Sequence, residues 1–286
     1  MEIARVGVVG LGTMGSGIAQ VCLQAGLEVV GREVEPQLGE AARSRIDHFL
    51  SRGVEKGRMT AEEKDAALGR LRLVTDLAEL ASCELVIEAA FEDLDVKRGL
   101  FAELDAIVAP EAILATNTSA LSVTQIGDAA ERQERVVGMH FFNPAPVLPL
   151  VEVVRTAHTS DEVFDAAYAF AKRIGKEPVA CNDTPGFIVN RILIPLLNDC
   201  VRVLDEARVT PDDVDRAMRF GANWPIGPCA LIDLIGIDVH VHASDALHAA
   251  LGEERMAPPQ RLVEMRDAGR LGRKSGRGFY EYEPPS

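Results

Sequence analysis

The chain has 286 residues, of which 47% are apolar and 26% are charged, so disorder, collagen and a simple coiled coil are excluded. A length of this size predicts about two domains. Thirty basic and 44 acidic residues give a formal net charge of −14, which argues against nucleic acid or an anionic membrane surface as the main partner. An anionic ligand would therefore need a local basic site.

The five cysteines are widely spaced and form no Cys-x-x-Cys pair, a pattern typical of reduced, mostly buried thiols in the cytosol. The N-terminus enters a strand-like run at once, which leaves no room for a signal peptide, and no apolar stretch approaches the roughly 18 residues of a membrane span. The six histidines show no metal-ligand spacing, and we expect His240 and His242 to be ordinary surface or interface residues. We predict a cytoplasmic protein that binds neither a membrane nor a metal.

The first half of the chain alternates short apolar runs with helical patterns. The expected strands are residues 3–9, 28–30, 73–75, 84–89, 113–116 and 135–140. The expected helices are residues 14–25, 36–54, a short segment capped by Thr60, and 96–108. This βαβα order predicts a Rossmann-type, doubly wound α/β domain with a mostly parallel sheet.

The pattern changes after residue 140, because three prolines between residues 144 and 149 predict an extended turn. The elements expected next are a strand at 150–154, a helix capped by Thr159 and closed by Gly175, and a last strand at 177–180. Helices alone are then expected at 187–206, from Thr210 onward, at 231–251 and at 259–268. We predict two domains, an α/β domain at residues 1–184 and an all-helical domain at residues 185–286.

A glycine-rich turn lies between the first strand and the first helix, and it reads Gly10, Leu11, Gly12, Thr13, Met14 and Gly15. In this context the first glycine permits a tight turn, the second lets the backbone approach a pyrophosphate, and the third lets helix and strand pack closely. The helix N-terminus adds N–H groups and a positive dipole end. The turn predicts a dinucleotide site; a ligand-free turn is the alternative.

Glu33 ends the second strand, in the region where an acidic side chain accepts hydrogen bonds from the adenosine ribose hydroxyls. This favours NAD over its 2′-phosphorylated relative. The neighbouring Arg32 argues the other way, since an arginine there accommodates a 2′-phosphate. An ordinary solvated charge is the alternative for Glu33. We predict NAD as the cofactor.

Residues 117–119, Asn-Thr-Ser, follow the strand at 113–116, and His140 ends the next strand. Both segments therefore lie at the carboxyl edge of the sheet, outside which open α/β sheets bind their ligands. A histidine at a strand end is as often structural as functional. Its role depends on what the following strand brings to it.

Glu152 lies on that following strand and reaches the imidazole of His140 if the strand returns antiparallel. A carboxylate on one ring nitrogen fixes the tautomer and stabilises the imidazolium when it forms. Ser119 and the amide of Asn190 can hydrogen-bond the reacting oxygen. The set suits proton abstraction from a secondary alcohol as hydride leaves for nicotinamide. An exposed strand position is the alternative for Glu152.

With these residues the chain resembles the 3-hydroxyacyl-CoA dehydrogenases. The motifs are Gly-Leu-Gly-Thr-Met-Gly-Ser-Gly-Ile-Ala (10–19), Asn-Thr-Ser (117–119), Gly-Met-His-Phe-Phe-Asn-Pro-Ala-Pro (138–146), Pro-Gly-Phe-Ile-Val-Asn-Arg (185–191) and Gly-Arg-Lys-Ser-Gly-Arg-Gly-Phe-Tyr (272–280). The resemblance covers the whole chain. The length matches the short, single-function members of the 3-hydroxybutyryl-CoA dehydrogenase type.

The resemblance implies that His140 and Glu152 act as acid and base on the 3-hydroxyl of an (S)-3-hydroxyacyl-CoA, with Ser119 and Asn190 positioning substrate and cofactor. It implies further cofactor contacts at Glu92, Lys97, Asn143 and Lys274, and coenzyme A contacts at Ser51, Lys56 and Lys97. The helical domain resembles the family's dimerisation domain, which implies a homodimer. The chain departs from the family at Glu33, where many relatives have aspartate, and at Gly31-Arg32, which interrupts a usually apolar strand end.

Residues 43–58 form a locally basic segment, with five basic and two acidic side chains. Coenzyme A carries several phosphate charges, and the resemblance implies that this helix and its following turn contact it. Without the resemblance, a solvated amphipathic helix of mixed charge is the better interpretation.

The leading hypothesis is an NAD-dependent dehydrogenase that interconverts a short-chain (S)-3-hydroxyacyl-CoA and the 3-oxoacyl-CoA. One alternative is a dehydrogenase for a dicarboxylyl-CoA such as 3-hydroxyadipyl-CoA, or for a free hydroxy acid. Another is a nucleotide-binding structural protein without catalysis. The joint presence of Ser119, His140, Glu152 and Asn190 argues against the last alternative.

Overall fold

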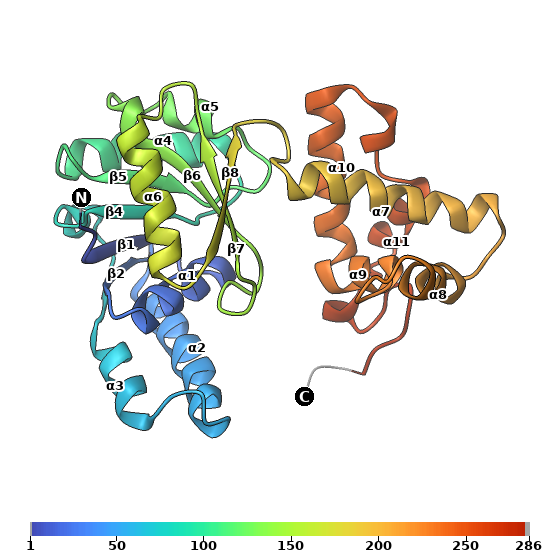
Figure 1. The fold of residues 1–286 in the computed structure, drawn as a ribbon, viewed down its shortest axis with the longest axis horizontal. Helices are drawn as coiled ribbons and strands as arrows, with labels where there is room; N and C mark the ends of the chain where they lie inside the picture. The colour runs from blue at the N-terminus through green and yellow to red at the C-terminus, as the bar shows by residue number, and fades with distance from the viewer. Residues whose placement is uncertain (1, 284–286) are drawn as a thin grey trace. The chain divides into compact units, whose positions relative to one another are not determined.

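The computed structural model describes residues 2–283 of the chain. It contains two compact units, Met1–Thr184 and Pro185–Ser286, which Figure 1 shows in blue to yellow and in orange to red. The junction falls at the position expected from the sequence. Within residues 2–283, no helix combines the length and the apolar character that a membrane span requires.

The first unit is built on an eight-stranded sheet with the strand order β3-β2-β1-β4-β5-β6-β7-β8. Neighbouring strands are parallel except for the antiparallel pair β6 and β7. The strands are β1 (Arg5–Val9), β2 (Glu28–Arg32), β3 (Leu71–Val74), β4 (Leu85–Glu88), β5 (Ile113–Thr116), β6 (Val136–Phe141), β7 (Leu150–Arg155) and β8 (Glu177–Asn182). The predicted doubly wound, mostly parallel α/β fold is confirmed.

The helices of the first unit are α1 (Thr13–Gln24), α2 (Pro36–Glu55), α3 (Ala61–Gly69), α4 (Leu94–Ile107), α5 (Val123–Gly127) and α6 (Asp161–Arg173). Ile18 of α1, Ile46 of α2 and Phe170 of α6 pack with buried strand residues in one cluster. Because helices cover the sheet, its strands are near-continuous apolar runs. The pair α2 and α3 extends beyond the sheet (Figure 1).

Local side-chain chemistry sets two helix starts in this unit. Thr60 caps α3 as predicted, since its hydroxyl accepts the N–H of Glu63 and the Glu63 carboxylate accepts the N–H of Thr60. The predicted cap at Thr159 is wrong. Ser160 caps α6 instead, because the Thr159 hydroxyl donates to the carbonyl oxygen of Val136 at the start of β6.

The second unit is helical, as predicted. Its helices are α7 (Val189–Glu206), α8 (Pro211–Gly221), α9 (Pro228–Ile235), α10 (Ile237–Leu251) and α11 (Gln260–Asp267), with a 3₁₀ turn, η4, at Arg273–Ser275. The single helical segment expected at 231–251 is divided at Gly236. This residue has a φ of 102°, a conformation that a side chain disfavours, so the chain changes direction there.

His240 differs from the expectation of a surface or interface residue, because it is fully buried in α10. Its Nε2 lies 2.8 Å from Oδ1 of Asn198 in α7. The Asn198 amide nitrogen donates to the backbone oxygens of Met256 and Ala257, so Oδ1 is the acceptor. Burial lowers the pKa of His240 to about 4, which keeps the ring neutral in the core. His242, two residues away, is exposed.

Candidate active site

The predicted catalytic residues and most of the predicted cofactor residues of the first unit gather at one edge of the sheet. The strands β2, β1, β4, β5 and β6 are parallel neighbours, so their carboxyl ends meet there. The strand order reverses between β1 and β4, and this switch point is where open α/β sheets bind ligands. The site residues that follow the five strand ends are Gly10, Glu33, Glu92, Ser119 and Asn143.

The glycine turn between β1 and α1 is shaped by two crowded glycines and leaves space at a third. Gly10 has a φ of 83°, and a Cβ there would lie 2.9 Å from the backbone of residues 89–90. A Cβ on Gly15 would lie 1.8 Å from the Gly10 carbonyl oxygen, whereas one on Gly12, the N-cap of α1, would meet no described atom within 4 Å. The open side of the turn therefore fits a pyrophosphate. The remaining turn residues are Leu11, Thr13 and Met14.

Glu33 lies beside this turn. Its Oε1 accepts the N–H of Leu11 at 2.5 Å, which brings the carboxylate to the position expected for a ribose contact. The guanidinium of Arg32 is engaged by the backbone after β3, because its Nε donates to the carbonyl oxygen of Thr75 at 3.0 Å. The arrangement fits a cofactor with a free 2′-hydroxyl.

Arg45 of α2 is a site residue that the sequence analysis counted only as a charge. Its guanidinium donates to the carbonyl oxygens of Leu11 and Gly12 and to the hydroxyl of Ser16. It therefore holds the outer side of the glycine turn and places a positive charge beside it. In the sequence, Arg45 is marked only by its place in the next helix after the one that follows the glycine motif. This spacing alone does not distinguish Arg45 from a solvated arginine.

His140 and Glu152 lie opposite each other on the antiparallel strands β6 and β7, so the predicted antiparallel return is confirmed. His140 Nδ1 is 2.7 Å from Glu152 Oε2, and the residues are 5% and 0% exposed. The Phe142 ring packs 4.4 Å from the imidazole, centroid to centroid. A carboxylate at Nδ1 favours the tautomer with the proton there, which makes Nε2 the basic nitrogen.

The loop after β5 is fastened to both neighbouring strands. The side-chain oxygen of Asn117 accepts the N–H of Phe141 at 2.9 Å, directly beside His140. On the other side, Glu92 Oε1 accepts the N–H of Ser119 at 2.9 Å. The predicted catalytic residues Ser119 and His140 thus belong to loops and strands that hold each other in place.

Glu92 and Lys97 meet at a charged cluster after β4. Lys97 is 1% exposed, and its Nζ lies 2.7 Å from Oε1 of Glu88 and 3.3 Å from Oε2 of Glu92. Burial alone would raise the pKa of the Glu92 carboxyl, but Lys97 and the hydrogen bonds from residues 118–120 outweigh it and lower this pKa. Glu92 is therefore an ionised acceptor at neutral pH. Glu88 was not predicted, because an acidic residue ending an apolar strand resembles an ordinary strand boundary.

The predicted coenzyme A residues lie on the helical pair beyond the sheet. Ser51 is in α2, and its hydroxyl accepts a hydrogen bond from Lys64 of α3 at 3.1 Å. Lys56 is the exposed C-cap of α2. Arg43 of the basic segment is already engaged within the protein, since its guanidinium donates to the carbonyl oxygen of Leu71.

Asn190 and Lys274 belong to the second unit. Asn190 lies in the first turn of α7. Lys274 lies in η4 and forms an ion pair of 2.6 Å with Asp238 of α10. The segment 272–280 around it is fastened to α9, because Asp233 accepts two backbone N–H groups from its end.

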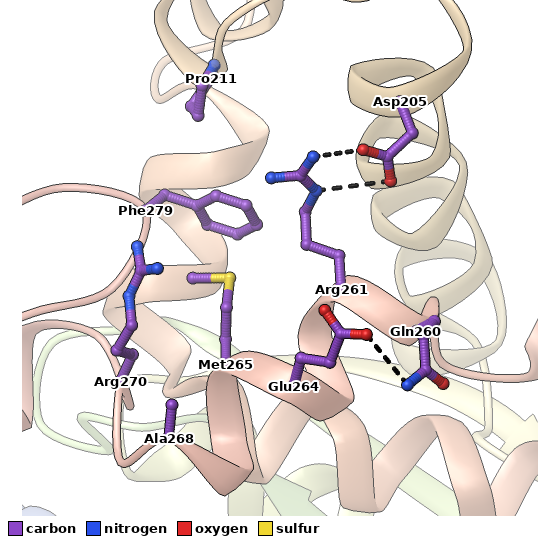
Figure 2. Close-up of a pocket in the computed structure, with 9 residues that line it drawn as sticks. All are labelled: Asp205, Pro211, Gln260, Arg261, Glu264, Met265, Ala268, Arg270 and Phe279. Carbon is purple, nitrogen blue, oxygen red and sulfur yellow. Dashed lines mark hydrogen bonds and ion pairs between the residues drawn. The ribbon is translucent and has the colours of Figure 1, made fainter.

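A hollow of about 390 Å³ lies elsewhere in the second unit, against α7 and α11. Figure 2 shows the guanidinium of Arg261 reaching Asp205 on one side, while Phe279 and Met265 lie on its other side. The residues that line the hollow include none of the predicted site residues. We therefore place the candidate active site at the carboxyl edge of the sheet.

A glycine turn before α1, an acidic residue after β2 and a buried His–Glu pair define a dinucleotide-dependent dehydrogenase as the class of protein. The family model for the 3-hydroxyacyl-CoA dehydrogenase NAD binding domain matches residues 5–184. The model for the C-terminal domain of the same family matches residues 186–282. The chain belongs to the 3-hydroxyacyl-CoA dehydrogenase family.

Individual relatives cover nearly the whole chain. The 3-hydroxybutyryl-CoA dehydrogenase of Mycobacterium tuberculosis is 46% identical over 282 residues, which are 98% of this chain and 99% of the relative. The structure of (S)-3-hydroxybutyryl-CoA dehydrogenase from Ralstonia eutropha matches with a TM-score of 0.95 at 40% identity, covering 99% of this chain and 100% of that one. The 3-hydroxyadipyl-CoA dehydrogenase of Escherichia coli is 42% identical over 99% of this chain, which spans 60% of that protein.

These matches make the chain an NAD-dependent enzyme that interconverts 3-hydroxyacyl-CoA and 3-oxoacyl-CoA. The predicted cofactor, enzyme class and acyl-CoA substrate are confirmed. The residue roles and the acyl group are treated below.

Proposed function

We propose that the chain acts on short-chain (S)-3-hydroxyacyl-CoA, with 3-hydroxybutyryl-CoA as the preferred substrate, and that His140 and Glu152 are its acid–base pair. The observation that carries this proposal is the 2.7 Å contact between the two buried side chains at the strand ends beside the Ser119 loop. Two relatives named for 3-hydroxybutyryl-CoA cover at least 98% of the chain and support the choice of acyl group.

In the oxidation, His140 takes the proton of the substrate 3-hydroxyl on Nε2, because Glu152 favours the proton on Nδ1. The Glu152 carboxylate then stabilises the imidazolium, and this interaction is strengthened because both side chains are buried. When bound, NAD accepts the hydride that leaves carbon 3 of the substrate. In the reverse direction His140 returns its proton to the oxygen. Ser119 and Asn190 hydrogen-bond this oxygen and orient it toward the imidazole.

The cofactor is held chiefly by the glycine turn and Glu33. The first N–H groups of α1 face the open side of the turn at Gly12 and bind the pyrophosphate. The Glu33 carboxylate accepts the ribose hydroxyls. The remaining contacts in this proposal come from Glu92, Lys97, Asn143 and Lys274.

Coenzyme A lies along α2 in this proposal, with Ser51 and Lys56 contacting its phosphates. The exposed basic side chains near the end of this helix are Arg52, Lys56 and Arg58. The end of α2 that carries these side chains lies beyond the sheet (Figure 1). Lys97 lies at the sheet edge instead, and its burial limits it to the reacting end of the substrate.

The acyl group is tested by following NADH absorbance with acetoacetyl-CoA, longer 3-oxoacyl-CoAs, 3-oxoadipyl-CoA and free 3-oxo acids. We expect the highest kcat/KM with acetoacetyl-CoA. A higher kcat/KM with 3-oxoadipyl-CoA would favour the dicarboxylyl alternative, which the Escherichia coli relative named for that substrate keeps relevant. Turnover of free acids alone would overturn the proposal.

The acid–base pair is tested with His140→Gln. We expect kcat to fall by about 10²- to 10⁴-fold, the usual contribution of a general acid–base, while NADH affinity stays unchanged. The matched control is His158→Gln, at an exposed position in the turn before α6, and it should retain wild-type kinetics. Comparable turnover in the two variants would overturn the role of His140.

We also propose that the second unit forms an isologous homodimer. It exposes the large apolar side chains Ile192, Phe220, Leu234 and Val239, and twofold dimers are the commonest homo-oligomers. Light scattering of the wild-type chain and of Phe220→Ser tests the assembly. The five unpaired cysteines, four of them buried, support the proposed reducing, cytoplasmic compartment.

A further inference from the structure

Glu88, the last residue of β4, is a buried carboxylate at the centre of the sheet edge, and it is 0% exposed. Its Oε1 accepts hydrogen bonds from the Lys97 ammonium at 2.7 Å and from the N–H of Ala90 at 2.6 Å. Its Oε2 accepts from the Thr116 hydroxyl at the end of β5, also at 2.7 Å. Ala90 and Thr116 lie in the loop after a strand and at a strand end, and Lys97 lies near the start of α4.

These contacts are part of a closed ring of hydrogen bonds and ion pairs, in which one link is a backbone N–H. The Thr116 hydroxyl oxygen accepts the N–H of Thr118 at 3.2 Å, and the Thr118 hydroxyl donates to Glu92 Oε1 at 2.5 Å. Oε2 of Glu92 meets Lys97, which returns to Glu88. We call this closed set the Glu88 ring, and its members are Glu88, Thr116, Thr118, Glu92 and Lys97.

The Glu88 ring lies between the glycine turn and the loop that carries Ser119. On one side, the backbone of Ala90 is so close to Gly10 that a Cβ on the glycine would lie 2.9 Å away. On the other side, Glu92 accepts the N–H of Ser119 at 2.9 Å. A displacement of Glu88 would therefore move both the cofactor turn and the substrate loop.

The charges of the ring argue for a positioning role beyond stability alone. Lys97 contacts both carboxylates of the ring and is 1% exposed. A buried ion pair often adds no more stability than well-packed apolar residues of the same size. Its hydrogen bonds do, however, restrict the geometry of the loops that they join, and catalysis depends on such geometry within about 1 Å.

We propose that Glu88 is a positioning residue that couples the cofactor turn to the substrate loop, with Lys97 as its counter-charge and Glu92 as its contact to the loop. This inference rests on the proposed function of Ser119 at the substrate oxygen.

The first test removes one arm of the ring with Thr116→Val, which keeps the shape but not the hydroxyl. Because the Ala90 arm is intact, we expect kcat to fall about tenfold while the NADH Kd, measured by fluorescence titration, stays within twofold of wild type. The control is Thr156→Val, a buried threonine whose hydroxyl bonds to Thr159 away from the site. It should lower Tm without changing kcat.

The second test is Glu88→Gln, which we expect to lower kcat and raise the NADH Kd by about tenfold each. The neutral double variant Glu88→Gln with Lys97→Met removes both charges, so it should recover Tm but neither kinetic constant. It also covers the case in which the single variant does not fold.

Wild-type kcat and NADH Kd in the double variant would overturn the inference, whatever its Tm. So would a loss of kcat in Thr156→Val equal to that in Thr116→Val. If the wild-type chain turned over no acyl-CoA, the proposed function would fail by itself. The NADH Kd of the Glu88→Gln variant would still test the coupling to the glycine turn.

Discussion

Gly12→Ala should weaken cofactor binding in this chain and leave the stability of the fold nearly unchanged. Gly12 has a φ of −60°, which any residue adopts, and a Cβ there would meet no described atom within 4 Å. The fold should accept the methyl group with little change in Tm. The same methyl group occupies the open side of the turn, where the pyrophosphate approaches the backbone. Loss of one hydrogen bond to a charged group costs about 1.5–3 kcal/mol, so NADH Kd should rise about 10- to 100-fold.

Gly15→Ala should behave differently, because its Cβ would lie 1.8 Å from the Gly10 carbonyl oxygen. Real Cβ contacts are not shorter than 3.0 Å, so α1 and the turn must separate by at least the difference between these distances. Both Tm and NADH affinity should therefore fall. Gly99→Ala is the matched control, since its Cβ in α4 also meets no described atom within 4 Å. Alanine favours a helix interior, so this variant should keep or raise Tm.

The assay is a fluorescence titration of each variant with NADH beside a thermal unfolding curve. A wild-type Kd in Gly12→Ala would refute the idea that the pyrophosphate approaches the turn at this residue. A fall in Tm equal to that of Gly15→Ala would show instead that the space around Gly12 is occupied. Only a weakened Kd with an unchanged Tm supports the reasoning.

Three further variants test the His140–Glu152 pair, the buried His240 and the basic segment at residues 43–58. Glu152→Gln should lower kcat about 10²- to 10⁴-fold, because the carboxylate no longer stabilises the imidazolium, and leave the NADH Kd unchanged; a wild-type kcat contradicts this. Burial lowers the pKa of His240 to about 4, so its contribution to stability is complete above pH 6.5 and is lost as the pH falls from 6.5 to 4. That loss is roughly 3 kcal/mol, and His240→Gln should flatten the dependence of Tm on pH in this window relative to the exposed control His242→Gln. Lys56→Ala should raise the KM for acetoacetyl-CoA about two- to fivefold at low salt and flatten its salt dependence, unlike Lys172→Ala; an unchanged KM across ionic strength rejects the placement on α2.

The elements that the sequence predicted best are those fixed by local patterns. The glycine turn before α1 needs no distant partner, since Gly10 and Gly15 are demanded by contacts within the same strand–turn–helix unit. The pairing of His140 with Glu152 was also accessible, because one antiparallel connection determines which residues of β6 and β7 face each other. In both cases a short stretch of chain contains the whole constraint.

The features that the sequence did not predict depend on contacts between distant segments. Ser160 rather than Thr159 caps α6 because the Thr159 hydroxyl bonds to Val136 on another element. His240 is buried because Asn198, 42 residues earlier in the chain, accepts its N–H. Neither partner is visible in the pattern around the residue itself. A polar side chain in an apolar run therefore shows that a partner is needed, without showing which one.

The net charge of −14 describes the composition of the whole chain and does not describe the electrostatic field at one site. An acidic chain binds an anionic cofactor because charges farther than about 8 Å are screened at physiological ionic strength. Close to the glycine turn, the groups that act are the N-terminus of α1 and the guanidinium of Arg45. The nearby carboxylates Glu33 and Glu92 are held by backbone N–H groups, at Leu11 and Ser119, so their charge is already partly compensated. The acidic excess therefore does not oppose binding at the glycine turn, where fixed N–H groups and Arg45 supply positive charge.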